Sequence, residues 1–444
     1  MNITFLTASL GSGGAERVVS LLANRMSEKG LQVEIICLMY DDVYYQTKPE
    51  VKLTVVPRVC PGNLIKRLFW LRRYVQKSGT EVCVAFTEGV YCATICALLG
   101  TRIPVIASER LDPHYMSWQR NLLKKIFLPH AAWLVVQTEH IKSYFKGKVA
   151  KKTSIILNPV NEKVFEVNGE RLTVNGDGLK IKDDDDNDDD DFLIEHKDTK
   201  AQRSFNEKEN TIISVARLFP QKRQEVLIKA FAKIAEKYPE WKLIIYGEGP
   251  ERAKLEKLIA SLDEKNNEND DENENTLNTK DTKDKGIDDE KQKTLKEVNG
   301  ERLMVNDEGL KTKDERLKIK ERILLPGRCE TIIEELNKAK IFAFSSDYEG
   351  LSNAMLEAVC VGLPIVSTRV SGTDELIREG FNGYVVDCGD TDALAEALEK
   401  LMGDEKKIQQ FSADSRKMAE QFRLDHIVRD WLELMERVIK KETL

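Results

Sequence analysis

The 444-residue sequence lacks a C-x-x-C pair and any long apolar run. Its eight cysteines are scattered singly, which argues against a zinc ribbon or a disulfide scaffold and favours a reduced cytosol. No apolar segment approaches the roughly 18–20 residues that a transmembrane helix needs. The N-terminal stretch MNITFLTASLGSGG has no basic region, so we expect no secretory signal. These absences predict a cytoplasmic protein.

Histidine is also scarce. Only five are present, and no two lie at the short spacing typical of metal ligands. We therefore expect no dedicated metal site, no metal cofactor and no histidine constellation for acid–base chemistry.

Charged residues are abundant, at 32% of the chain, and the excess lies in two tracts. Residues 166–209 carry 15 acids and 7 bases, and residues 261–320 carry 18 acids and 13 bases, so together they contribute 20 − 33 = −13. The whole chain carries −7, which leaves the remainder at +6. Such composition predicts two acidic, disordered or loosely held insertions without strands.

The two tracts share a repeat. EVNGERLTVNGDGLKIKD begins at Glu166 and EVNGERLMVNDEGLKTKD begins at Glu297, and they agree at 14 of 18 positions. A single recurrence at this distance does not indicate a solenoid. Two solvated surface insertions of common origin are the favoured interpretation, and a functional pair of docking modules is the alternative.

Outside the tracts, short apolar runs alternate with helical patterns. We expect strands at residues 2–8, 33–39, 82–86, 104–108, 133–138 and 152–157, and again at 211–216, 242–247, 322–327, 340–346 and 364–368. This alternation predicts two α/β, Rossmann-like, doubly wound domains that face each other across a cleft. We expect an acceptor-side domain at 1–160 and a donor-binding domain at 210–423, with a hinge near Asn158-Pro159 and a helix at about 424–444 that packs back on the first domain.

Three loops that follow strands carry the candidate chemistry, and the first and third of them contain glycine. The turn GSGGAE at 11–16 suits an anion, although Glu16 breaks the G-x-G-x-x-G pattern and a tight structural turn is the alternative. Arg217 and Lys222, in VARLFPQKR, are placed to clamp a diphosphate, with an ordinary solvated basic loop as the alternative. Gly247 and Gly249 form the third loop, in YGEGP.

The sharpest feature is SSDYEGLSNAMLEAVCVGLPIVST. Glu349 precedes a predicted helix, and Glu357 lies about one turn inside it. Between them, amides at Gly350, Leu351, Ser352 and Asn353 suit phosphate at a helix N-terminus. The two carboxylates can accept hydrogen bonds from sugar and ribose hydroxyls.

With these motifs the chain resembles the large family of retaining glycosyltransferases of the GT-B fold, of the bacterial group 1 and family 4 type. The resemblance covers nearly everything outside the two tracts and rests on GSGGAERVV, VARLFPQK, YGEGPER, LPGR and EGLSNAMLE. It implies catalytic roles for Glu349, Arg217 and Lys222. It implies donor contacts from Gly13, Gly14, Gly247, Gly249, Arg328, Gly350, Leu351, Ser352, Asn353 and Glu357.

The segment Ala107-Ser108-Glu109-Arg110 departs from the family pattern. Relatives often carry a histidine near the transferred sugar, and Arg110 stands at that position here. Glu109 and Arg110 become acceptor-side candidates. SERLDP resembles members that build surface polysaccharide or lipid-linked oligosaccharide.

Two basic amphipathic stretches, NLIKRLFWLRRYVQK at 63–77 and WQRNLLKKIFL at 118–128, are typical either of helices packed on a sheet or of helices lying on anionic lipid. The basic remainder of the chain favours peripheral attachment to the inner membrane. We expect no nucleic-acid partner.

The sequence thus predicts a retaining, metal-independent glycosyltransferase of the hexosyltransferase type, with a nucleotide-sugar donor, UDP-linked by family resemblance, and a glycan or lipid-linked acceptor. A nucleotide-sugar 2-epimerase of the same fold is one alternative. A non-catalytic sugar-nucleotide-binding scaffold is another.

Overall fold

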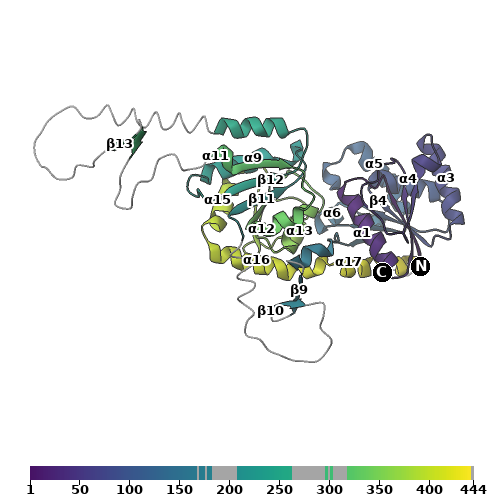
Figure 1. Cartoon of the computed structure of the whole chain (residues 1–444). Coiled ribbons are helices and arrows are strands. Elements are labelled where there is room, and N and C mark those ends of the chain that lie inside the picture. Colours follow the sequence, from purple (N-terminus) through teal and green to yellow (C-terminus); the bar gives the residue numbers. More distant parts are fainter. Residues whose placement is uncertain are drawn as a thin grey trace, which may run out of the picture.

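The computed structural model describes residues 1–165, 208–262 and 318–441, together with the backbone of short strands within 166–182 and 296–303. Two α/β domains lie side by side and are joined by residues near Asn158-Pro159 (Figure 1). Among the described residues, no helix has both the length and the apolar character needed to cross a membrane.

The first domain is built on a parallel sheet of the order β3-β2-β1-β4-β5-β6-β7. The alternation of its central strand explains the layers: Ile3 and Phe5 pack on one face and Leu6 packs on the other. The strands are β1 (Asn2–Thr7), β2 (Gln32–Cys37), β3 (Lys52–Val55), β4 (Val82–Phe86), β5 (Val105–Ser108), β6 (Trp133–Val136) and β7 (Thr153–Ile155).

Helices cover both faces of this sheet. The longer ones are α1 (Gly14–Glu28), α3 (Leu64–Lys77), α4 (Glu88–Leu98) and α5 (Trp118–Phe127), and the shorter ones are α2 (Val56–Val59), α6 (Glu139–Tyr144), α7 (Gly147–Ala150), η1 (Pro113–Tyr115), η2 (Leu128–His130) and η3 (Glu162–Phe165). Helix α1 packs on one face, and α3 and α4 pack on the other.

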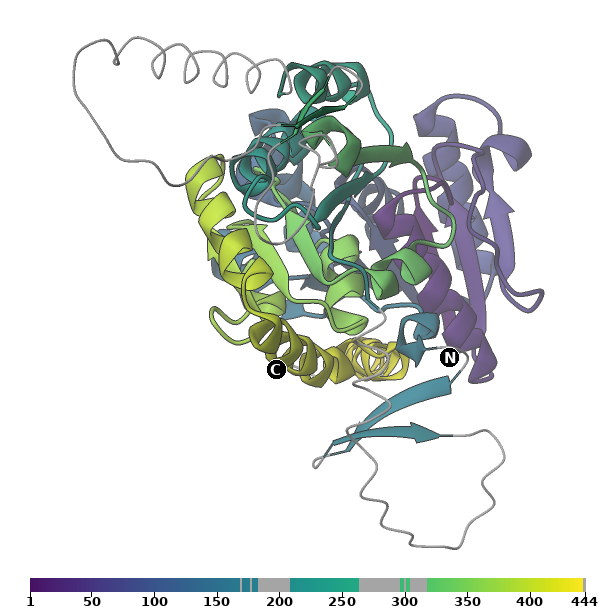
Figure 2. The ribbon, with the colours of Figure 1, turned by 60° about the vertical axis from the view of Figure 1, so that its left-hand side comes forward.

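The last helix of the chain, α17 (Leu424–Lys440), returns to the first domain. It lies beside α1 in both views (Figures 1 and 2). Trp431 is completely buried there and stacks on Phe86, with ring centroids 5.9 Å apart. The C-terminal helix therefore completes the core of a domain that begins more than 400 residues earlier.

The second domain repeats the architecture with a parallel sheet of the order β15-β12-β11-β16-β17-β18. Its strands are β11 (Thr211–Val215), β12 (Lys242–Tyr246), β15 (Ile323–Gly327), β16 (Ile341–Phe344), β17 (Ile365–Thr368) and β18 (Gly383–Val386). The helices are α9 (Gln224–Ile234), a segment over 252–262, α11 (Ile319–Arg322), α12 (Ile332–Lys338), α13 (Asn353–Cys360), α14 (Thr373–Leu376), α15 (Thr391–Met402) and α16 (Glu405–Ala419), with η4 (Pro220–Lys222) and η5 (Glu420–Phe422).

Both sheets reverse their strand order, between β1 and β4 in the first domain and between β11 and β16 in the second. Ligands of open α/β sheets bind beyond the carboxyl ends of the strands at such points. The predicted fold class, two doubly wound domains facing each other, is confirmed.

The expectation that the charged tracts lack strands is wrong for the repeat. One copy pairs β8 (Glu166–Val167) with β9 (Glu170–Asn175), which also pairs with β10 (Gly178–Lys182). The second copy pairs β13 (Lys296–Val298) with β14 (Glu301–Leu303) in the same register, because Glu166 faces Arg171 as Glu297 faces Arg302. The Asp-rich run at 183–191 lies outside the described residues.

Candidate functional site

Lys222 and Glu349 come together at the carboxyl ends of β11 and β16. Lys222 ends the short helix η4, and Glu349 lies in the loop before α13. The Lys222 Nζ and the Glu349 Oε1 form an ion pair, and both side chains are largely buried. The Lys222 ammonium also lies 5.3 Å from the centroid of the Phe344 ring. The lysine charge is thus held in place by a carboxylate and an aromatic face.

The first residues of helices α1 and α13 meet across the domain boundary. Asn353 Nδ2 donates a 3.3 Å hydrogen bond to the Gly14 carbonyl oxygen, and Asn158 Nδ2 donates a 2.6 Å bond to Asn353 Oδ1. A Cβ on Gly14 would lie 2.9 Å from Asn353 Nδ2, so glycine permits this approach. Because helix N-termini carry partial positive charge, two of them meeting form a favourable place for an anion.

The segment that opens α13 is fixed from both sides. Ser352 Oγ caps the helix by accepting a 3.3 Å bond from the Met355 amide, and Leu351 is buried in the core of the second domain. A Cβ on Gly350 would lie 2.5 Å from the Arg110 carbonyl oxygen. Glycine is therefore required where the acceptor-side and donor-side loops touch.

Glu357 has a partner that the sequence analysis missed. Its carboxylate, almost fully buried in α13, forms an ion pair with the Arg17 guanidinium from α1 of the opposite domain. Arg17 lies one turn after Gly14, on the turn-and-helix motif GSGGAERVV. The helical spacing of that motif predicts that Arg17 lies on the same helix as Gly14. Only the docking of the two domains shows that Arg17 pairs with Glu357.

The Gly247 and Gly249 loop supports the segment that contains Arg217. The backbone φ angles are +146° at Gly247 and +159° at Gly249, and Cβ atoms there would lie 1.9 Å and 2.2 Å from the carbonyl oxygens of Ala216 and Leu218. The Leu218 amide donates a 2.9 Å bond to the Glu248 carbonyl oxygen. These contacts give the two glycines a structural role beneath the predicted donor site.

Arg217 itself is exposed, with its guanidinium 4.8 Å from the Phe219 ring centroid. Its charge also interacts with Glu16, in the glycine turn of the first domain. Burial raises the pKa of the Glu16 carboxyl, and the positive charge of Arg217 opposes that shift. Gly13, the residue before α1, packs directly against the Glu16 carboxylate. Arg217 therefore lies within electrostatic reach of the turn at Gly13 and Gly14.

Arg328 lies at the edge of this region. It is exposed after β15, and its guanidinium lies 4.7 Å from the centroid of the Tyr44 ring in the first domain.

Other side chains also join the two domains. Tyr115 stacks on Tyr348, with ring centroids 4.8 Å apart. Thr138 and Ser371 add a hydroxyl–hydroxyl bond of 2.9 Å. The donor-side residues face the first domain through side-chain contacts. Two cavities of about 360 and 310 Å³ among the described residues are lined by other side chains.

The two acceptor-side candidates differ in environment. Glu109 is inside the first domain, where it forms a 2.6 Å ion pair with Lys124 and accepts a 2.9 Å bond from the Tyr91 hydroxyl. Arg110 is also buried, donates a 2.6 Å bond to Asn158 Oδ1, and lies over the Phe86 ring. Burial lowers the pKa of Arg110, and its Nε and Nη2 have no hydrogen-bond partner among the described residues. Of the two, only Arg110 has side-chain donors without a hydrogen-bond partner among the described residues.

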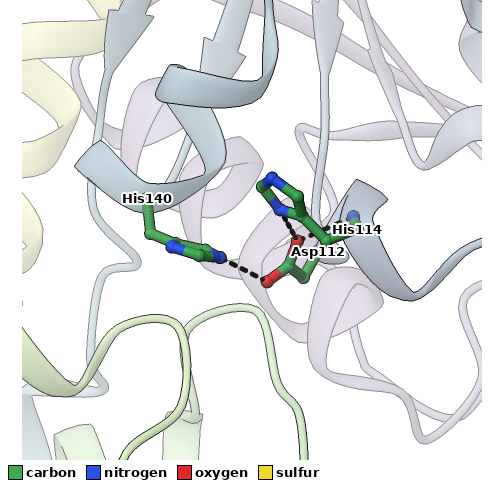
Figure 3. Close-up of side chains that lie close together, drawn as sticks. All are labelled: Asp112, His114 and His140. Atoms are coloured by element: carbon green, nitrogen blue, oxygen red, sulfur yellow. Dashed lines mark hydrogen bonds and ion pairs between the residues drawn. The ribbon is translucent and has the colours of Figure 1, made fainter.

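The expectation that no histidines cluster is wrong. His114 and His140 both lie against the Asp112 carboxylate (Figure 3). They are 26 residues apart in the sequence, so spacing gave no signal, but β5 and β6 are adjacent and their carboxyl ends bring the loops together. The cluster lies on the first domain, next to Tyr115.

Two family models match the chain. The model "Glycosyltransferase Family 4" matches residues 12–164, and "Glycosyl transferases group 1" matches residues 195–269 and 300–418. The chain belongs to these glycosyltransferases. The two matches correspond to the two domains of the structure, and the resemblance inferred from the motifs is confirmed.

Curated relatives match this glycosyltransferase over its length. The GalNAc-alpha-(1->4)-GalNAc-alpha-(1->3)-diNAcBac-PP-undecaprenol alpha-1,4-N-acetyl-D-galactosaminyltransferase of Campylobacter jejuni is 24% identical over 99% of both chains. An N-acetylgalactosamine-N,N'-diacetylbacillosaminyl-diphospho-undecaprenol 4-alpha-N-acetylgalactosaminyltransferase of the same organism is 22% identical, over 96% of this chain and 97% of its own.

Solved structures share its fold. Anabaena HepE in complex with UDP matches with a TM-score of 0.66 and 16% identity, covering 98% of this chain and all of its own. A sucrose-phosphate synthase from Thermosynechococcus elongatus matches with a TM-score of 0.66 and 15% identity over the whole of both chains.

Proposed function

We propose that this glycosyltransferase transfers a sugar, with retention and without a metal ion, from a UDP-sugar to a lipid-linked glycan. The meeting of the α1 and α13 N-termini beside Lys222 and Glu349 is the observation that carries the proposal. It gathers positive potential and a carboxylate at the switch points of both sheets, where a nucleotide and a sugar would lie next to each other.

The leaving group sets the chemical requirement. A nucleoside diphosphate gains negative charge as the anomeric bond breaks, and preorganised donors stabilise that charge in the transition state. Lys222 Nζ, the Arg217 guanidinium and the amides that open α13 supply these donors. Lys222 forms an ion pair with Glu349, so we infer that a bound diphosphate replaces Glu349 as the partner of Lys222 and that the sugar hydroxyls bind the freed carboxylate.

Glu357 would hold the ribose. Its carboxylate engages Arg17 in this conformation, so binding a ribose hydroxyl requires the arginine to share or release that oxygen. Arg17 then becomes available to the diphosphate at the same helix end. This exchange would couple donor binding to the contact between the two domains.

The acceptor side rests on Arg110 and on the relatives. The unused Nε and Nη2 of Arg110 suit an oxygen-rich ligand where other family members carry histidine. Both Campylobacter relatives are named for diphospho-undecaprenol-linked acceptors. We extend that acceptor class, and a location at the inner face of the membrane, to this chain as part of the proposal.

The nucleotide-sugar 2-epimerase remains the second candidate. Its chemistry needs acid–base side chains, and the cluster of Asp112, His114 and His140 contains two imidazoles. The two functions separate in one experiment. The protein is incubated with each member of a nucleotide-sugar panel, alone and with a lipid-linked acceptor, and the products are separated by chromatography. Transfer that requires the acceptor supports the proposal, and an epimer formed from donor alone would replace it.

The base of the donor is tested by binding. A ligand specific for the native state raises its stability as RT ln(1 + [L]/Kd). Thermal shifts should therefore be larger with UDP than with ADP or GDP at equal concentration. A larger shift with ADP or GDP would overturn the assignment of uracil.

A further inference from the structure

We propose that Asp112, His114 and His140 form an open binding site for a divalent transition-metal ion of the zinc type. The cluster lies on the first domain, begins two residues after Arg110, and uses none of the residues proposed to hold the donor. The inference does not depend on the proposed function, because it concerns binding of an ion rather than transfer of a sugar.

The three side chains present their ligand atoms to one another. Asp112 and His114 belong to the loop and short helix η1 after β5, and His140 belongs to α6 after β6 (Figure 3). His114 Nδ1 lies 2.7 Å from Asp112 Oδ1, and His140 Nε2 lies 3.0 Å from Asp112 Oδ2. All three ligand atoms can be chosen within 4.8 Å of one another. Zinc binds nitrogen and oxygen at about 2.0–2.2 Å, so small side-chain movements would admit one ion between them.

The burial of the Asp112 carboxylate is a second observation that favours a bound cation. The Asp112 side chain is only 1% exposed. Its Oδ1 accepts bonds from the His114 backbone amide and ring, but its buried Oδ2 has no hydrogen-bond partner among the described residues. His140 Nε2 lies 3.0 Å from that oxygen as an ion-pair contact (Figure 3). A buried anionic oxygen without a hydrogen bond is costly, and a cation would compensate it.

The ligand set selects the class of ion. Two imidazoles and one carboxylate suit Zn²⁺ and related transition metals, whereas Mg²⁺ and Ca²⁺ prefer oxygen ligands throughout. The His114 ring is held edge-on against Tyr144, with centroids 5.1 Å apart, which limits its rotation. The two histidine side chains are 41% and 53% exposed, so coordination positions remain open to solvent. Three protein ligands with an open position are the pattern of a reactive or exchangeable site rather than of a closed structural one.

The test uses the full-length protein, stripped with a chelator and freed of it by gel filtration. Zn²⁺ is titrated by calorimetry, and Co²⁺ is titrated by its visible absorption, which reports nitrogen and oxygen ligation of low coordination number. We expect one equivalent to bind, with affinity lowered at least tenfold in His114→Ala and in His140→Ala. His426→Ala is the matched control, because His426 lies on α17 and contacts Arg429 instead.

The outcomes are decisive in both directions. Loss of the stoichiometric site in the two cluster variants, with the control unchanged, supports the proposal. Absence of a one-to-one site in the unaltered protein, or a site that survives both substitutions, overturns it and leaves an Asp–His hydrogen-bonded cluster. Circular dichroism checks each variant. If His114→Ala fails to fold, His140→Ala decides, since His140 lies at the exposed start of α6.

Discussion

Charge at single residues accounts for most of the proposed chemistry. Lys222 forms an ion pair with Glu349, and Arg17 forms one with Glu357. Each pair joins groups that the proposal assigns to different parts of the donor. Under the proposed function, donor binding would exchange these ion pairs for contacts with the ligand, so that buried charges are not left unpaired.

Glu357→Gln tests the ribose assignment. Contacts to ribose change little between ground and transition states, so their loss should raise KM for the donor more than it lowers kcat. Steady-state kinetics at varied donor concentration measure the split, with Glu396→Gln, an exposed position on α15, as the control. A fall in kcat at unchanged KM would contradict a ribose role.

The arrangement of site residues within one sequence motif could be predicted from the sequence. The contacts that form only when the two domains dock could not. The string from Glu349 to Glu357 contains its own loop and helix start, so its local geometry follows from neighbouring residues. Arg17 meets Glu357, and Gly14 meets Asn353, only because two domains dock. His114 and His140 similarly meet through the order of β5 and β6, which spacing alone does not encode.

At the scale of elements, the central strands were predictable and two edge strands were not. The apolar runs of the sequence do not predict β3 or β18, which both lie at sheet edges. Their residues are only partly buried, in contrast to the fully buried run of β4. A half-exposed edge strand gives a weaker apolar signal than a strand covered on both faces.

Helix α17 packs against the first domain, and Trp431→Ala tests how much this packing stabilises the fold. The side chain is fully buried against Phe86, so its removal leaves a large cavity. We expect the free energy of unfolding to fall by about 3–5 kcal/mol. Urea denaturation measures it, with Glu433→Ala on the exposed face as the control. A change below about 1 kcal/mol would show that α17 is not part of this core.

The two charged insertions should be dispensable. Shortening residues 168–207 and 264–318 to brief linkers should leave folding and nucleotide binding intact, because loop closure depends weakly on length. Most of both segments lies outside the described residues, so the prediction rests on their composition and shared repeat. Thermal shift with UDP compares the trimmed and full-length chains. An insoluble or non-binding trimmed protein would assign the repeat a structural role.

At the scale of the whole molecule, exposed apolar and basic side chains gather on one side of the first domain. Phe69 and Ile65 on α3, and Trp118 and Ile126 on α5, are each more than half exposed, and both helices pack against α4. On α3, Lys66 and Arg73 are exposed, and Lys66 Nζ donates a 3.1 Å bond to the Pro61 carbonyl oxygen. Arg67 and Arg72 are half-buried and also donate to backbone carbonyl oxygens. The distribution suits shallow insertion with a modest electrostatic contribution.

Binding to membranes should therefore be peripheral and salt-sensitive. A cation near an anionic surface contributes about 1 kcal/mol, and salt screens it. Flotation with anionic and neutral liposomes at low and high salt measures the effect. Lys66→Ala combined with Trp118→Ala should weaken binding, and Lys229→Ala, exposed on α9 of the second domain, should not. Equal binding to neutral vesicles, or no binding at all, would reject the surface.

The central claim is that Lys222 and Glu349 form a donor site that works without a metal ion. Single-turnover transfer from the preferred nucleotide sugar, measured with EDTA present, tests it most directly. We expect full activity from the unaltered protein, no product from Glu349→Ala, and a rate about 10²–10³-fold lower from Lys222→Ala. Near-unaltered turnover by both variants, or loss of all activity in EDTA with recovery on adding Mn²⁺ or Mg²⁺, would contradict the account.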